Sequence, residues 1–78
     1  MKLEMYSIKD ELNGYTVTIP ILSEDLTKRY FKDQILGNPT MKNSKEDFSI
    51  WHMGKFDQET GVYQSENPKL IERGKNYE

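Results

Sequence analysis

Residues 48–62, FSIWHMGKFDQETGV, decide the fold of this chain. The first nine are nearly all apolar, aromatic or compatible with a β-strand, a pattern typical of a strand buried on both faces. The next five are turn formers, and Gly61 is free to take a positive φ. The stretch therefore predicts a central strand over residues 48–57, a tight turn, and a strand that returns antiparallel at residues 62–64.

Two further strand patterns lie at the N-terminal end. Residues 3–9 alternate roughly between apolar and polar, and residues 15–19 alternate strictly with β-branched or aromatic side chains. Asn13-Gly14 lies between them and is a strong signal for a hairpin turn. Pro20 cannot donate to a ladder, so pairing should stop there or lie on an edge. We expect these two segments to form a hairpin.

One helix is predicted over residues 24–36. Ser23 is a good N-cap, and the acidic residues that follow it favour the first turn of a helix. Gly37 suits the position just after a helix, and Asn38-Pro39 prevents its continuation. Helical spacing predicts that the stripe facing the sheet contains Leu26, Tyr30, Phe31 and Ile35.

The remaining segments complete a small α+β domain. A polar loop is predicted over residues 40–45, a turn at Asn67-Pro68, a last short strand over residues 69–73, and a frayed tail over residues 74–78. The order β-β-α-β-β-β predicts one domain over residues 1–78, with about five short antiparallel strands and one helix packed on one face.

Composition limits the function classes. The chain has 78 residues and no Cys, which leaves a small core with no disulfide and no thiolate metal site, so a homodimer is expected. Its net charge of −2 disfavours coating nucleic acid by bulk charge, although a local basic patch stays compatible with it. The sequence has no apolar run of transmembrane length and no signal peptide, so we expect no membrane contact and a place in the cytoplasm.

No catalytic motif is found, so the sequence predicts neither an enzyme nor a cofactor. His52 is the only histidine and has no Cys or second His to join it around a metal. A histidine near a sheet face is the simpler interpretation. Carboxylates flank the central strand and could hold a cation between strand ends, or could cap the preceding loop and start the turn. They are Glu46, Asp47, Asp57 and Glu59.

Aromatic side chains are dense for so small a domain. They are Tyr6, Tyr15, Tyr30, Phe31, Phe48, Trp51, Phe56 and Tyr63. A single helix covers one face of a sheet, so rings on the other face would stack bases or pack against a second subunit. Strict alternation places Trp51 and Met53 on one face. It places Phe48, Ile50, His52 and Phe56 on the other.

Basic residues gather in sequence along the helix and the loop after it. They are Lys28, Arg29, Lys32, Lys42 and Lys45. A patch of this kind could follow a phosphate backbone. The alternative is an ordinary solvated helix face, diluted by Glu24, Asp25 and Asp33.

The run from Glu46 to Gly61 resembles a family signature, P-E-D-Y-x-L-x-x-x-G-x-F-D-x-x-T-G. That signature belongs to a small nonstructural protein family of gokushovirus-type microviruses, tailless phages with circular single-stranded DNA. The resemblance covers residues 3–73. Lys45 stands where the family usually has Pro, and Phe48 where it usually has Tyr.

The resemblance implies a nonstructural protein without enzyme activity, suspected of a role in viral DNA synthesis or in the switch to single-strand packaging. One hypothesis is a dimeric module that binds single-stranded DNA during genome replication or packaging. Its expected stacking residues are Tyr15, Trp51 and Tyr63, and its expected phosphate contacts are Lys28, Arg29, Lys32, Lys42 and Lys45. The other is a protein-interaction module that regulates a viral or host replication protein without touching DNA, with Trp51 or Phe56 as anchor.

Overall fold

The N-terminal alternation of apolar and polar residues forms β1 (Lys2–Asp10), the strand on which the sheet is built. β4 (Phe48–Asp57) pairs antiparallel with one side of β1, and β5 (Tyr63–Arg73) pairs antiparallel with the free side of β4. The short strands β2 (Gly14–Tyr15) and β3 (Ile19–Pro20) pair with the other side of β1. The sheet order is β2-β1-β4-β5, which confirms the predicted α+β class and the central place of β4.

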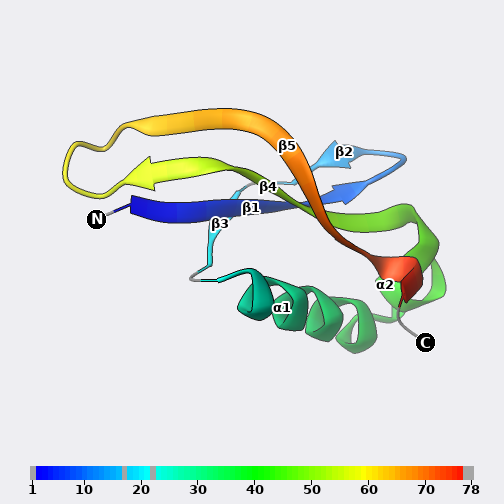
Figure 1. Cartoon of the computed structure of the whole chain (residues 1–78). Coiled ribbons are helices and arrows are strands. Elements are labelled where there is room, and N and C mark those ends of the chain that lie inside the picture. Colours follow the sequence, from blue (N-terminus) through cyan, green and yellow to red (C-terminus); the bar gives the residue numbers. More distant parts are fainter. Residues whose placement is uncertain (1, 17, 22, 77–78) are drawn as a thin grey trace.

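The computed structural model describes residues 2–16, 18–21 and 23–76, and in these α1 (Glu24–Gly37) is the main helix. Ser23 caps it as predicted, because its Oγ accepts the N–H of Leu26 at 3.2 Å. α1 lies along one side of the twisted sheet (Figure 1). No helix in the described part of the chain is both long and apolar enough to cross a bilayer.

The core lies between α1 and one face of the sheet. Its buried cluster contains Phe31 and Ile35 from α1, Tyr6 from β1 and Ile50 from β4. The predicted helix stripe is correct for Phe31 and Ile35, and Tyr30 packs against the cluster. It is wrong for Leu26, which is 42% exposed, because the buried positions are Thr27, Phe31 and Ile35. These three are spaced by four residues and define the face that meets the sheet.

The segment after α1 is helical, and the predicted polar loop is wrong. α2 (Pro39–Asn43) follows at once, and a 3₁₀ turn, η1 (Lys45–Asp47), leads into β4. Asn38 begins α2, because its Oδ1 accepts the N–H of Thr40 at 3.0 Å, and Pro39 occupies the first turn. The Asn-Pro pair that ends one helix therefore starts another.

β5 is one long strand, so the predicted turn at Asn67-Pro68 is wrong. Pairing with β4 goes from Gly54 opposite Ser65 to His52 opposite Lys69, and the intervening residues of β5 bulge out of the ladder. An edge strand tolerates such a bulge and a proline within it. The predicted strand over residues 15–19 is also interrupted, into β2 and β3, and its Val17 lies outside the described residues.

The C-terminal segment is more ordered than the predicted frayed tail. Gly74–Asn76 form a second 3₁₀ turn, η2, and Gly74 is buried. A Cβ at Gly74 would clash with the carbonyl oxygen of Lys45, so glycine permits this close approach to η1. The predicted tail at residues 77–78 lies outside the described residues.

β4 is only partly buried along its length, which corrects the prediction of burial on both faces. A bulge at Met53 explains a second error. Tyr6 lies opposite His52 while Met5 lies opposite Gly54, so one extra residue of β4 shifts the alternation. Phe56 is thereby moved to the same face as Trp51, opposite the face that carries Phe48, Ile50 and His52.

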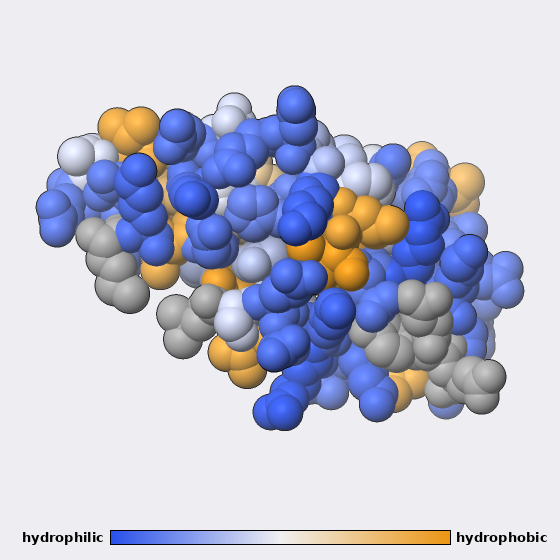
Figure 2. Space-filling model, viewed as in Figure 1, coloured by the Kyte–Doolittle hydropathy of each residue, from blue (hydrophilic) through white to orange (hydrophobic). Residues whose placement is uncertain are grey.

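The sheet extends beyond the helix. In Figure 1, α1 lies beneath the end of the sheet that carries β2, and the β4–β5 hairpin projects past it. We call the part of the sheet that packs on α1 the covered half. We call the β4–β5 hairpin from Gly54 to Ser65, with the start of β1, the hairpin half. Seen from the side shown in Figure 2, the surface is mostly hydrophilic, and its largest hydrophobic group lies where β5 crosses towards α1.

Candidate nucleic-acid interface

The face of the sheet turned away from α1 is the candidate interface, and we call it the helix-free face. Alternation along β1 places Leu3, Met5, Ser7 and Lys9 on this face, because Tyr6 points into the core. Their partners on β4 share the face, since residues directly opposite in a ladder point the same way. Trp51 lies opposite Ser7, and Phe56 lies opposite Leu3.

The N-terminal hairpin places Tyr15 beside Lys9. Gly14 takes φ 89°, and the Asp10 carboxylate accepts the backbone N–H of Leu12 at 3.0 Å and the side-chain amide of Asn13 at 2.8 Å. These bonds fix the turn and set Tyr15 opposite Lys9. The predicted Asn-Gly turn is therefore confirmed, and it determines the position of the first ring.

Lys9, Tyr15 and Trp51 form a compact cluster on the helix-free face. The ring centroids of Tyr15 and Trp51 are 6.2 Å apart, with an interplanar angle of 81°. The Lys9 Nζ lies over both rings, 5.4 Å from the Tyr15 centroid and 5.6 Å from the Trp51 centroid. Both distances allow a cation–π interaction. Tyr15 is 42% exposed, so the cluster presents a ring and an ammonium group to solvent.

Hydrogen bonds hold the cluster in place. The Trp51 indole N–H donates to Ser49 Oγ at 2.8 Å, which fixes the tilt of the indole. The buried Ser7 Oγ donates to the carbonyl oxygen of Thr16 at 2.7 Å, which ties the chain after Tyr15 to β1. Side chains that are fixed before binding lose less conformational entropy on binding.

A second cation lies in the same row of the sheet. Ser49 pairs with Lys9 on one side and with Arg73 on the other, so Arg73 is also on the helix-free face. Arg73 is exposed. A carboxylate partly offsets these charges, because Glu11 Oε1 lies 4.0 Å from Lys9 Nζ. The row nevertheless sets two cations beside Trp51.

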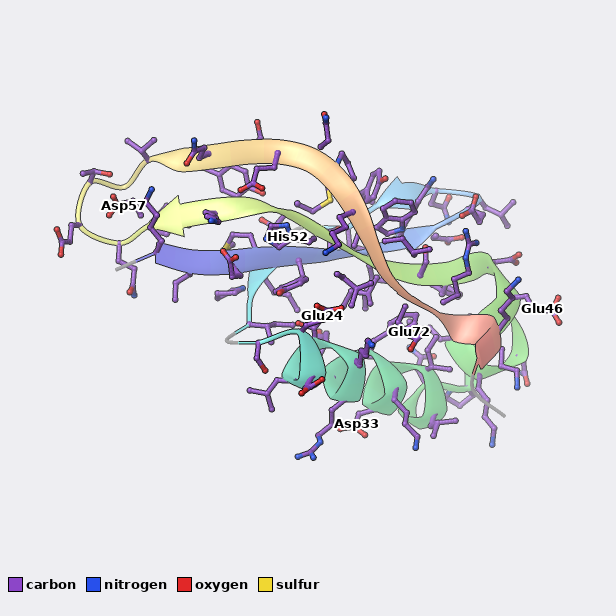
Figure 3. The ribbon with its side chains drawn as sticks, in the orientation of Figure 1. Glu24, Asp33, Glu46, His52, Asp57 and Glu72 are labelled. Atoms are coloured by element: carbon purple, nitrogen blue, oxygen red, sulfur yellow. The ribbon has the colours of Figure 1, made fainter. Side chains whose placement is uncertain are left out.

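The predicted cations of the helix lie away from this cluster. Lys28, Arg29 and Lys32 line a shallow hollow together with Asp33 and Glu72. Figure 3 shows Glu72 between β5 and α1, whereas Asp33 points away from the sheet. The other two predicted cations, Lys42 on α2 and Lys45 in η1, follow further along the chain. The structure therefore brings three of the five predicted cations together around one hollow, which two acidic residues also line.

Of the three predicted stacking rings, Tyr15 and Trp51 are in contact and Tyr63 is not. Tyr63 lies opposite Phe56 in the hairpin half and is 40% exposed. Sequence reasoning missed Lys9 and Arg73. The Asn-Gly signal does not place Lys9, because a two-residue Asn13-Gly14 turn would pair Leu12 with Tyr15, whereas the structure pairs Lys9 with Tyr15 across a longer loop. Arg73 could not be placed, because its row depends on the bulges of β5.

His52 lies on β4, as the simpler interpretation predicted, and it is on the helix side of the sheet because it pairs with Tyr6. Its ring meets Tyr6 edge to face at 5.2 Å, and its Nε2 lies 3.7 Å from Glu4 Oε1. Nowhere in the described residues do three potential metal ligands of the His, Asp or Glu type gather. His52 therefore packs within the sheet beside one carboxylate.

Of the carboxylates flanking β4, Asp57 acts in local structure. Glu46 and Asp57 lie at opposite ends of the strand (Figure 3). Asp57 Oδ1 accepts the N–H of Glu59 at 2.9 Å and that of Thr60 at 3.4 Å. The Glu59 N–H is the main reason that the pKa of Asp57 lies below its ordinary value of 3.8. The interpretation of Asp57 as the start of the turn is confirmed.

Comparison with known proteins gives one match. The model of a family described as Phage ORF5 protein matches residues 3–77. No curated protein and no solved structure matches the chain.

Proposed function

The chain belongs to the phage ORF5 protein family, and from that premise we propose that it is a nonenzymatic phage protein that binds single-stranded DNA. The resemblance to gokushovirus proteins carries the proposal one step further, to a role in replicating or packaging a single-stranded genome. The observation that supports binding is the cluster of Lys9, Tyr15 and Trp51 on a face that α1 leaves uncovered.

The cluster combines the two kinds of group that bind a single strand. Exposed aromatic rings stack on bases irrespective of sequence, at about 1–3 kcal/mol per base. Cations contact phosphates and release counterions. Lys9 and Arg73 supply the charge beside the rings of Tyr15 and Trp51. The same rings cannot stack on the bases of a duplex, because those bases are already stacked on one another.

The helix cations have a lesser role in this proposal. Lys28, Arg29 and Lys32 lie on the helix that covers the other face, and Asp33 and Glu72 share their hollow. They attract the strand by long-range charge without contacting it at the cluster. Acidic residues elsewhere limit this attraction, in keeping with a net charge of −2.

Fluorescence titration tests the proposal. Trp51 is the only tryptophan, so intrinsic fluorescence reports directly on the cluster. A single-stranded oligonucleotide of about 20 nucleotides, several times the smallest known site sizes of about 4, is added at low and at physiological salt. We expect saturable quenching that falls steeply with salt.

Two charge variants separate the cluster from the helix. Lys9→Gln should weaken binding and reduce the slope of log affinity against log salt by about 1, the effect of one lost phosphate contact. The double variant K32Q/K42Q removes two charges away from the cluster and serves as the control, with a smaller loss of affinity. Equal losses in the two proteins would assign binding to general charge. No quenching at low salt, with a folded protein shown by circular dichroism, would end the DNA-binding proposal and favour a protein partner.

A further inference from the structure

The helix-free face carries a second aromatic pair at its other end. Phe56 and Tyr63 are directly opposite in the β4–β5 ladder, and Leu3 lies opposite Phe56 on β1. The bulge at Met53 brings this pair to the face that also carries Trp51. Tyr63 is 40% exposed, so its ring is open to a ligand.

The surface between the two aromatic groups is free of charged side chains in the rows that the described residues form. Moving from Phe56 towards Trp51, the rows hold Met5 opposite Gly54, with Ser65 on β5. Met5 is 9% exposed and Gly54 has no side chain. These rows leave an uncharged path with cations at the Trp51 end only, and the charged Glu66 lies beside it in the bulge of β5.

The spacing of the two groups sets a length. Trp51 and Phe56 lie opposite Ser7 and Leu3, which are four residues apart on β1, because Met53 bulges out of the ladder. A strand rises by about 3.3 Å per residue, so the two groups are roughly 13 Å apart. A stacked nucleic-acid strand advances by about 3.4 Å per nucleotide, so the distance corresponds to about four steps. Counting both end bases, about five nucleotides bridge the two groups, and fewer if the strand is stretched.

We propose that the helix-free face binds single-stranded DNA at two points, with bases stacked at Trp51 and Tyr15 and again at Phe56 and Tyr63. This inference rests on the proposed function and adds a minimum ligand length of about five nucleotides. The phosphates near the first point lie against Lys9 and Arg73. The second point binds by its rings alone.

Affinity as a function of oligonucleotide length tests the inference. Oligothymidylates of increasing length, from two to twelve nucleotides, are titrated into the protein and followed by Trp51 fluorescence. We expect the affinity to rise by about tenfold as the strand becomes long enough to reach the second point, the effect of one stacked base. Longer strands should gain little more.

The variant Tyr63→Leu keeps apolar bulk at an exposed strand position and removes the ring. It should lose the rise with length and keep the affinity for the shortest strands. Val62→Ala is the matched control, since Val62 is 59% exposed next to Tyr63 and has no ring. It should keep the rise.

The outcomes separate this inference from the proposed function. A wild-type protein that binds strands of every length with no rise, or a Tyr63→Leu protein that keeps the full rise, would overturn the second point and leave DNA binding standing. A wild-type protein that binds no oligonucleotide would overturn both.

Discussion

The covered half and the hairpin half of the sheet are built from the same strands and differ in what lies behind them. In the covered half, Tyr6 and Ile50 are buried against Phe31 and Ile35 of α1. In the hairpin half, every residue of β5 from Tyr63 to Ser65 is exposed. Hydrophobic burial therefore stabilises one half, and the other depends on ladder hydrogen bonds and turn geometry.

This difference separates stability from function within 78 residues. The buried core cluster lies on the face of the sheet that meets α1. Both proposed stacking points lie on the opposite face, where a substitution changes no contact with α1. We therefore expect variants in the two halves to behave differently.

Phe31→Ala should break the covered half. Phe31 is fully buried, and removing a ring from a well-packed core costs about 3–5 kcal/mol, which is a large part of the stability of a small domain. Urea denaturation followed by circular dichroism should show loss of the cooperative transition or a much lower midpoint. Leu26→Ala, on the same helix but 42% exposed, should change the stability by less than about 0.5 kcal/mol. Similar losses of stability in the two variants would mean that the buried face of α1 does not contribute more to the core than its exposed face.

Gly54→Ala should release the hairpin half and leave the covered half folded. Gly54 has φ 154°, and a Cβ there would clash with the carbonyl oxygen of Gln64 on β5. The expected cost is about 1–3 kcal/mol. Hydrogen exchange should show lost protection at Lys55 and retained protection at Ile50. Gly37→Ala is the control, because no atom lies within 4 Å of its added Cβ, and it should not destabilise the protein. Equal loss of protection in both halves would contradict the division.

Ser23→Ala should destabilise the covered half mildly, by about 1 kcal/mol, because the N–H of Leu26 loses its acceptor. Thermal unfolding measures the loss. Ser44 precedes η1 without making a side-chain cap, so Ser44→Ala should be close to neutral. A larger loss from Ser44→Ala than from Ser23→Ala would show that the start of β4, and not the start of α1, limits stability.

Acid should loosen the hairpin turn before the core. The folded-state pKa of Asp57 lies below the ordinary value of 3.8, mainly because the carboxylate accepts the N–H of Glu59. Its stabilising contribution is therefore complete above that value and is lost as pH falls through the lower folded pKa. NMR shifts of the Glu59 and Thr60 amides should report the titration. Asp57→Asn keeps an acceptor that does not titrate and should abolish that pH dependence, whereas an unchanged profile would assign it to another group.

Local signals in the sequence predicted the parts of the fold that depend on local chemistry. The Ser23 cap, the Asn-Gly turn and Gly61, which takes φ 75°, are each specified by a few adjacent residues. The helix and β4 followed from patterns of nine residues or more. The errors arose where a long-range contact decides between two locally acceptable structures. Asn38-Pro39 can end a helix or begin one, and Asn67-Pro68 can turn the chain or bulge from an edge.

The candidate site shows the same limit more sharply. Tyr15 and Trp51 were identified as rings that could stack, but only the register of β1 brings them together. The bulge at Met53 moves Phe56 to the other face. Among the residues from His52 to Lys55, Gly54 is the only one whose type indicates a bulge. A period of two residues predicts faces reliably only until the first bulge.

The irregular outer edge of β5 also governs how copies of this protein behave at high concentration. A regular edge strand presents a continuous row of unpaired N–H and C=O groups, which can template fibril growth. Here Pro68, which has no N–H, lies in a segment that leaves the ladder, between the charged residues Glu66 and Lys69. A strand of another copy therefore meets no continuous row of N–H and C=O groups with which to pair. The sheet resists extension into fibrils for this reason, and a protein with a thin core can stay dispersed.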